Sequence, residues 1–185
     1  MTKRIQENEP ERTFRLWSFQ RADVPKLMQR ETRYCASWEH TPRNWRVAYE
    51  WMARELQSRK GLSGCQALVW CWHSCRKWEA GPTVEVAESL LSDWDREQGL
   101  VTVELIVPEQ LSLLSSYRMW NELLDVVHDS GSLPSSLEFH ESMFEEPLLR
   151  DEEDNVQAVL PYIESAWIVD VRPLSLAVRH GSELV

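Results

Sequence analysis

The sequence predicts a single α+β domain in which a small mixed or antiparallel sheet packs against helices. Three observations lead to this fold class. The chain has 185 residues, 43% of them hydrophobic, which suits one domain with a buried core better than two marginal ones. Segments with the two-residue period of strands are interspersed with segments of helical periodicity. Ten tryptophans supply bulky apolar surface for packing between these elements.

The domain is expected to span residues 13–173. Residues 1–12 are polar and lack periodicity, so we predict a disordered tail there, and residues 174–185 are predicted to be a loose C-terminal tail. Residues 129–154 are polar, acidic and poorly periodic. This composition indicates a mobile acidic connection inside the domain.

The first elements follow from local residue patterns. Residues 14–19 alternate in polarity and are rich in aromatic side chains, which indicates a strand. A short helix is expected over residues 24–31. Asp23 would be its N-cap, and Pro25 is tolerated in its first turn.

The clearest helix begins after Thr41, which is an N-cap residue followed by a proline at the first helical position. Its apolar face is formed by residues at helical spacing, namely Trp45, Ala48, Met52 and Leu56. Gly61 is expected to end the helix. Opposite charges four residues apart on the outer face, such as Arg46 and Glu50, account for local charge without a ligand.

Two segments in the middle of the chain are predicted to be strands. Residues 66–73 (QALVWCWH) are apolar on both faces, which is typical of a central strand. The break at 81–82 precedes a predicted short helix at 84–91. Residues 100–107 (LVTVELIV) form the second strand, and Pro108 ends it.

The last third predicts a helix over residues 117–128, which Gly131 ends. The acidic run at 151–154 would suit the N-terminus of a helix, because the helix dipole favours negative charge there. We therefore expect a helix over residues 155–165. A final strand is predicted at 167–171.

The charge is unevenly distributed along the chain. Residues 1–80 hold 15 Lys and Arg against 9 Asp and Glu, a net charge of +6, whereas residues 81–185 hold 5 against 21, a net charge of −16. An acidic C-terminal half would suit a basic protein partner. Direct nucleic-acid binding is disfavoured, because the acidic half opposes it and much of the positive charge is used in helix-face pairs.

No run of about 18 apolar residues is present, so we predict no membrane partner, and the charged N-terminus predicts a cytoplasmic protein. In that setting Cys35, Cys65, Cys71 and Cys75 are expected to be reduced thiols. Cys71, His73 and Cys75 share one face of a predicted strand. They would lie ~6–7 Å apart, which is awkward for one ion, so no metal is predicted.

Several segments of the chain resemble, in order, the bacterial and archaeal domain of unknown function 3841 over roughly residues 14–173. These segments read LWSFQ at 16–20, AYEWM at 48–52, VWCW at 69–72, LLSSY at 113–117, WNELL at 120–124 and VQAVL at 156–160, followed by WIV at 167–169. The chain departs from the family pattern at Ser116, where the family tends to carry aspartate, and at 77–82. If those family residues are catalytic, this member has lost the activity. The resemblance itself implies no mechanism.

The order of the predicted elements also resembles the split-sheet layout of small ADP-ribosyltransferases. In those enzymes polar residues of the first strand, an aromatic residue of the second strand and a late glutamate hold NAD. The resemblance gives the first role to Ser18 and Gln20, with Arg15 near the pyrophosphate. It gives the second role to Trp70 or Trp72. Likeness of layout does not establish function by itself.

The same resemblance gives the catalytic role to Glu104 or Glu138. Glu104 stands inside an otherwise apolar strand, so it is expected to face water, the alternative being a partner such as Arg or His. The candidate ligand-binding set is completed by residues at strand ends and on the following helix, namely His73, Ser115, Tyr117 and Trp120.

The tryptophans leave two interpretations open. Trp70 and Trp72 share one strand face, and they either line a pocket or belong to an aromatic core. The most concrete functional hypothesis is an NAD-binding, ADP-ribosyltransferase-like enzyme. The alternative is a non-catalytic acidic module that binds another protein, as inhibitors, immunity proteins and regulatory subunits do. Whether the chain is an enzyme is left open at this point.

Overall fold

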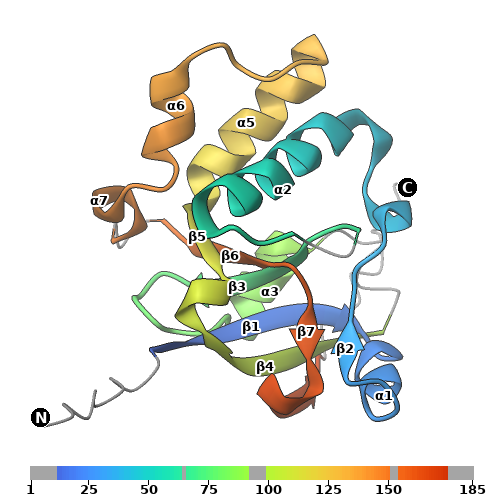
Figure 1. Cartoon of the computed structure of the whole chain (residues 1–185). Coiled ribbons are helices and arrows are strands. Elements are labelled where there is room, and N and C mark those ends of the chain that lie inside the picture. Colours follow the sequence, from blue (N-terminus) through green and yellow to red (C-terminus); the bar gives the residue numbers. More distant parts are fainter. Residues whose placement is uncertain (1–11, 64–65, 92–98, 151–153, 175–185) are drawn as a thin grey trace, which may run out of the picture.

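The computed structural model of the chain describes residues 12–63, 66–91, 99–150 and 154–174, without the side chains of 137–138 and 147–148 (Figure 1). The predicted tails therefore lie, apart from Arg12 and Leu174, outside the described residues. The predicted α+β class is confirmed, because helices cover a sheet whose paired strands are all antiparallel. No described helix is both long and apolar enough to cross a membrane.

The main sheet has six strands in the order β5-β6-β3-β1-β4-β8. Their bounds are Thr13–Arg21 for β1, Val69–Ser74 for β3, Leu100–Pro108 for β4, Leu113–Ser116 for β5, Val156–Leu160 for β6 and Ile168–Pro173 for β8. A second, two-stranded sheet pairs β2 (Arg33–Tyr34) with β7 (Ile163–Glu164).

Helices connect and cover these strands. The described α-helices are α1 (Val24–Met28), α2 (Arg46–Lys60), α3 (Val84–Leu90), α5 (Tyr117–Ser130), α6 (Leu137–Ser142) and α7 (Glu146–Leu149). Short 3₁₀ turns lie at Trp38–His40, Arg43–Trp45, Glu109–Leu111 and Ser165–Trp167. Gly61 and Gly131 end α2 and α5 in the left-handed conformation that glycine adopts readily.

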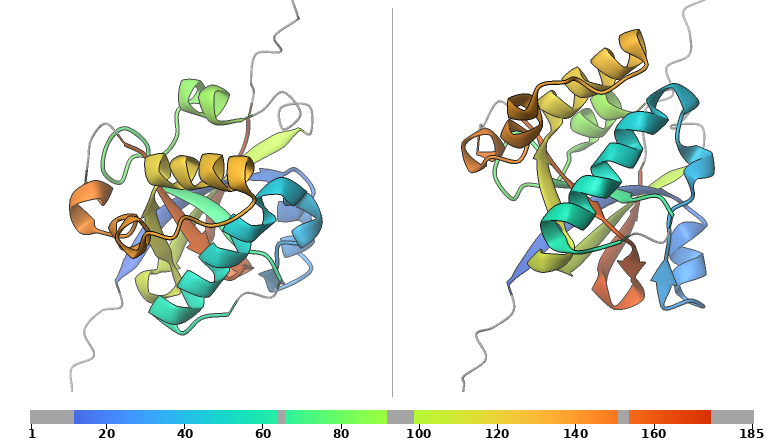
Figure 2. Two further views of the ribbon diagram at one scale, coloured as in Figure 1. Left: turned by 90° about the horizontal axis from the view of Figure 1, so that it is seen from above. Right: turned by 45° about the horizontal axis from the view of Figure 1, so that its top comes forward.

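The two faces of the main sheet carry separate cores. Helices α2 and α5 lie side by side over its β5-β6-β3 end (Figure 2), and the core beneath them includes Met52, Leu56, Trp120, Leu123 and Val159. The opposite face packs against α1 and β7, and its core includes Leu16, Val24, Met28, Leu105, Leu160 and Ile163. Strand alternation explains the division, because neighbouring residues of β6 point to opposite faces.

The main sheet is nearly divided between β1 and β3. Strand β1 pairs with β4 at every residue from Thr13 to Arg21. It meets β3 at one register pair, between Trp17 and Trp72. The sheet therefore consists of two halves, β5-β6-β3 and β1-β4-β8, that join at this pair.

The predicted helix over residues 155–165 is wrong. Residues 156–160 form β6, which lies between β5 and β3, and all five of its residues are buried. Burial on both faces favours apolar side chains, and four of the five residues of β6 are apolar, so the strand lacks the alternation that would have identified it. Asp154 does lie at a helix N-terminus, but the helix is α5, whose Arg118 N–H donates to the Asp154 carboxylate.

Two smaller predictions, the cap at Thr41 and the free thiol at Cys35, are also wrong. Thr41 does not cap α2, which follows a 3₁₀ turn and begins after Trp45. The strand β5 was not predicted, and residues 129–154 contain helices α6 and α7. Cys35 is disulfide-bonded and so is not a free thiol. It precedes the bridge between Ala36 and Ala67, a tertiary pairing that the sequence does not reveal.

Candidate functional site

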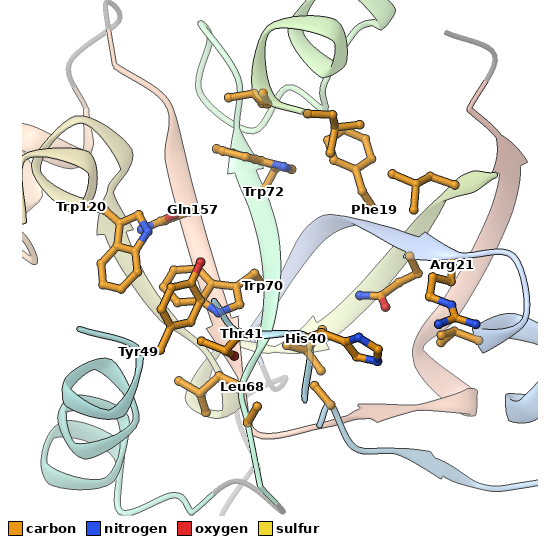
Figure 3. Close-up of a pocket in the computed structure, with 18 of the residues that line it drawn as sticks. Phe19, Arg21, His40, Thr41, Tyr49, Leu68, Trp70, Trp72, Trp120 and Gln157 are labelled. Atoms are coloured by element: carbon orange, nitrogen blue, oxygen red, sulfur yellow. The ribbon is translucent and has the colours of Figure 1, made fainter. Parts of the chain in front are cut away.

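A pocket of about 450 Å³ opens where β1 and β3 part, and we call it the aromatic pocket (Figure 3). The pocket is lined by residues of both strands, including Gln20 of β1 and Trp70 of β3. Helix α5, the end of α3 and residues 36–41 supply further walls. Its aromatic lining consists of Phe19, Tyr34, Tyr49, Trp70, Trp72, Tyr117 and Trp120.

Side-chain hydrogen bonds join the two strands beyond the point where they part. The hydroxyl of Ser18, which is fully buried, donates to the Trp70 carbonyl at 2.7 Å. The amide of Gln20 donates to the Ser18 hydroxyl, also at 2.7 Å. Ser18 thus connects the strands from behind, while Gln20 extends to the pocket lining.

The tryptophans serve both as core and as pocket wall. Trp120 is 3% exposed and packs on Trp70, with ring centroids 4.6 Å apart. Tyr49 meets both indoles edge-on at 5.2 Å, and Trp72 meets Tyr117 at 4.9 Å. Because Trp70 and Trp72 are only partly buried, each leaves ring surface free for the pocket.

The pocket has two chemically different sides. Trp120, Gln157, Tyr49 and Trp70 lie together on one side, whereas Arg21 and His40 lie on the other (Figure 3). Arg21 is exposed and forms an ion pair with Asp23, and His40 is exposed too. A ligand with a flat ring at one end and negative charge at the other would complement this distribution.

Gln157 is the most buried polar side chain of the lining. It is 3% exposed and stands opposite Trp72 in the pairing of β6 with β3. Its Nε2 atom is buried and has no hydrogen-bond partner. The amide of Asn121, by contrast, donates to the Tyr117 carbonyl at 2.8 Å. A buried donor without a partner is costly, so Gln157 is a candidate for contact with a ligand.

Glu104 lies on the same sheet face as Gln157 but outside the aromatic pocket. Register pairs link Gln157 to Trp72, Trp72 to Trp17, and Trp17 to Glu104. Three strand spacings separate the two ends of this row, a span of about 14 Å. Glu138 belongs to α6, and its side chain lies outside the described part of the chain.

The Glu104 carboxylate is fully engaged. It accepts from Arg15 Nε at 2.6 Å, from Trp17 Nε1 at 3.2 Å and from Arg172 at 3.2 Å. Glu104 is 6% exposed, whereas both arginines are exposed. The expectation that Glu104 faces water is therefore wrong, and the alternative of a basic partner is the one found. Arg15, assigned to the pyrophosphate of NAD, lies with Glu104 and is not in the pocket lining.

His73 and Ser115 are buried and do not line the aromatic pocket. His73 points to the sheet face opposite Trp72, where its ring packs between Phe14 and Trp78. Burial lowers the pKa of His73 below its ordinary value, although Glu79 acts in the opposite direction. Ser115 stands beside Gln157 in the pairing of β5 with β6, and its hydroxyl also has no partner.

Two of the buried side chains near β3 are cysteines. Cys71 and Cys75 are free thiols, and burial raises the pKa of each to about 12. Such thiols stay protonated near neutral pH and make poor nucleophiles. In the described part of the chain, no three His, Cys, Asp or Glu side chains gather as metal ligands would.

The structure thus brings together Gln20, Trp70, Trp72, Tyr117 and Trp120 of the predicted site, with Ser18 directly behind them. Sequence reasoning missed the other lining residues, among them Arg21, His40, Tyr49, Asn121 and Gln157. Tyr49, Asn121 and Gln157 fall within the segments that resemble the family. The segments that contain these three residues come together at the pocket. Their shared membership in the family-like segments is the signal that could have identified the three residues.

The charge polarity of the sequence is partly cancelled in three dimensions. Ion pairs join the basic and acidic halves of the chain: Arg15 with Glu104, Arg33 with Glu164 and Arg59 with Glu141. At these three places the negative charge of the acidic half is therefore neutralised by arginines of the basic half. Binding of a basic protein partner stays a prediction.

One protein family matches most of the chain. The family is described as a domain of unknown function (DUF3841), and its model matches residues 15–161. Comparison with curated proteins gives no match. Comparison with solved structures gives no match either.

Proposed function

We propose that this chain, which belongs to the domain of unknown function 3841 family, binds NAD in the aromatic pocket. The observation that carries the proposal is the position of this pocket at the division between β1 and β3. The order of the elements along the chain resembles the split-sheet layout of small ADP-ribosyltransferases, in which residues of the first two strands help to hold NAD. Here these strands contribute Gln20, Trp70 and Trp72 to the lining.

The size and lining of the pocket support a nucleotide ligand. A volume of about 450 Å³ falls within the range of small-molecule sites. The indoles of Trp70 and Trp72 offer flat apolar surfaces on which nicotinamide can stack. On the opposite side Arg21 and His40 supply donors for the pyrophosphate, which arginine binds well.

NAD binding is tested by titration, followed by tryptophan fluorescence quenching and by calorimetry. We expect saturable binding at or below millimolar NAD. Trp70→Leu should weaken it at least about fivefold, because stacking of a base on an aromatic ring contributes ~1–3 kcal/mol. Absence of binding at millimolar NAD contradicts the proposal.

A matched control is provided by Trp78. It is 36% exposed, lies after β3 and does not line the aromatic pocket. Trp78→Leu removes a more exposed tryptophan outside the pocket and should leave NAD affinity within about twofold of the parent protein, since it loses no stacking surface in the pocket. Thermal unfolding of both variants confirms that they are folded. Equal losses from the two substitutions would argue against the pocket as the binding site.

Turnover of NAD, with Glu104 as the catalytic residue, stays a prediction and has its own test. Nicotinamide released from NAD is measured by chromatography for the parent protein and for Glu104→Gln. Loss of release in the variant, with unchanged NAD affinity, supports a catalytic role. Equal release from the two proteins contradicts it, and the three contacts of the carboxylate then describe a structural role.

A further inference from the structure

The inner side of the aromatic pocket holds one polar group that the fold leaves unsatisfied. Gln157 is 97% buried, being 3% exposed, and it lines the pocket while its Nε2 atom has no partner. The other amides of the lining differ in this respect. Gln20 donates to Ser18, and Asn121 donates to the Tyr117 carbonyl. Gln157 is therefore the amide of the lining whose donor is left for a ligand.

The surroundings of Gln157 restrict the acceptor that it can meet. Around it are the rings of Trp70, Trp120 and Tyr49, while Arg21 and His40 lie on the far side of the pocket (Figure 3). A charged acceptor would lose its hydration there without gaining a cation, which is costly. A neutral carbonyl on a flat ring would satisfy the amide and stack on the indoles.

We infer that Gln157 recognises the carboxamide carbonyl of nicotinamide, and that the pocket therefore selects NAD over its deamidated form. This inference rests on the proposed NAD binding and deepens it. It gives the ligand an orientation, with nicotinamide beside Gln157 and the pyrophosphate toward Arg21 and His40. Gln157 is then a specificity-determining residue.

Ser115 provides the competing structural explanation. Its hydroxyl is fully buried, is also without a partner, and stands opposite Gln157 in the register of β5 and β6. A buried water between the two side chains would satisfy both without any ligand. In that case Gln157 and Ser115 would stabilise the fold together, and replacement of either should have the same kind of effect.

The experiment measures affinities by calorimetry for three probes: NAD, nicotinic acid adenine dinucleotide and ADP-ribose. For the parent protein we expect NAD to bind at least about tenfold more tightly than the deamidated dinucleotide, because a site built for a neutral carbonyl rejects a buried carboxylate. Gln157→Leu should reduce the ratio of NAD affinity to ADP-ribose affinity by about tenfold. Ser115→Ala, the matched control, should leave that ratio unchanged.

The outcomes separate this inference from the proposed function. Failure of the parent protein to bind NAD, whether or not it binds ADP-ribose, overturns the proposed function and the inference together. Equal affinity for NAD and its deamidated form, or an unchanged ratio in Gln157→Leu, overturns the inference alone. A structural role for Gln157 would instead appear as parallel losses of thermal stability in Gln157→Leu and Ser115→Ala. The ratio of NAD affinity to ADP-ribose affinity would then be unchanged in both variants.

Discussion

Glu104 and Gln157 occupy the two ends of one row of side chains across the sheet, and their surroundings are opposite. Glu104, in the β1-β4-β8 half, is 6% exposed and accepts from three side chains. Gln157, in the β5-β6-β3 half, is 3% exposed and has an amide donor without a partner. A buried polar group that is satisfied within the fold contributes to structure. One that is left unsatisfied and also lines a pocket is a candidate for contact with a ligand.

The largest expected effect concerns the satisfied end. Glu104→Leu removes the acceptor of the buried Trp17 N–H and of Arg15, and one of the two acidic partners of Arg172, so we expect a loss of roughly 2–3 kcal/mol in the free energy of unfolding. This lies below the cost of breaking a fully buried pair, because both arginines are more than half exposed and partly hydrated. Urea-induced unfolding measures the loss. Glu164→Leu removes a more exposed partner of one arginine and should cost less than about 1 kcal/mol.

The middle of the row can be disturbed through Gly81. A Cβ atom at this position would lie 2.5 Å from Cε2 of the Trp17 ring, closer than packing allows. Gly81→Ala should therefore lower the free energy of unfolding by roughly 1–3 kcal/mol. A second change, Trp17→Phe, removes the fused-ring atoms that clash. If Gly81→Ala costs as much in the Trp17→Phe background as in the parent protein, the close contact is not the cause.

Replacement of Gln157, at the unsatisfied end of the row, should raise the free energy of unfolding, whereas replacement of Glu104 lowers it. Gln157→Leu replaces a buried donor without a partner by an apolar side chain of similar size, so the ligand-free protein should gain about 1 kcal/mol in stability. Thermal unfolding without ligand measures the gain. A gain in stability together with a loss of NAD affinity would show that Gln157 serves ligand binding and destabilises the ligand-free protein. A fall in stability would contradict the contrast between the two ends.

The smallest effect concerns His73, which is buried on the other sheet face. Its pKa is lowered in the folded protein, mainly by burial, so below about pH 6.5 the unfolded chain binds a proton more readily than the folded one. The free energy of unfolding should therefore fall as the pH is lowered from 7 toward 5. His73→Phe should reduce this slope. An unchanged slope would show that other groups cause the pH dependence.

Most helices and strands could be predicted because their signals are local. The alternation of residues 14–19 identified β1, and the mostly apolar run 100–107 before Pro108 identified β4. Gly61 and Gly131 marked the ends of α2 and α5. Strand β6 could not be identified in this way. Its neighbours in the sheet bury both of its faces, and a short apolar run looks the same in a buried strand and in a helix.

The candidate site could be predicted only in part. Trp70 and Trp72 were found because they share one face of a recognisable strand. Gln157 was missed because its segment was assigned to a helix, which hides its pairing with Trp72. Glu104 was expected to face water, and its burial was not foreseen, because the arginines that meet it come from β1 and β8, at distant positions in the chain.

The sequence by itself determined the fold class, most of the elements and the aromatic residues available to a site, since these follow from periodicity and composition. Only the tertiary structure decided which of two buried polar residues is satisfied. Satisfaction depends on which side chains of other strands come within hydrogen-bonding distance, and strand pairing sets those neighbours. Glu104 met two arginines and an indole across its neighbouring strands, whereas Gln157 met the open wall of a pocket.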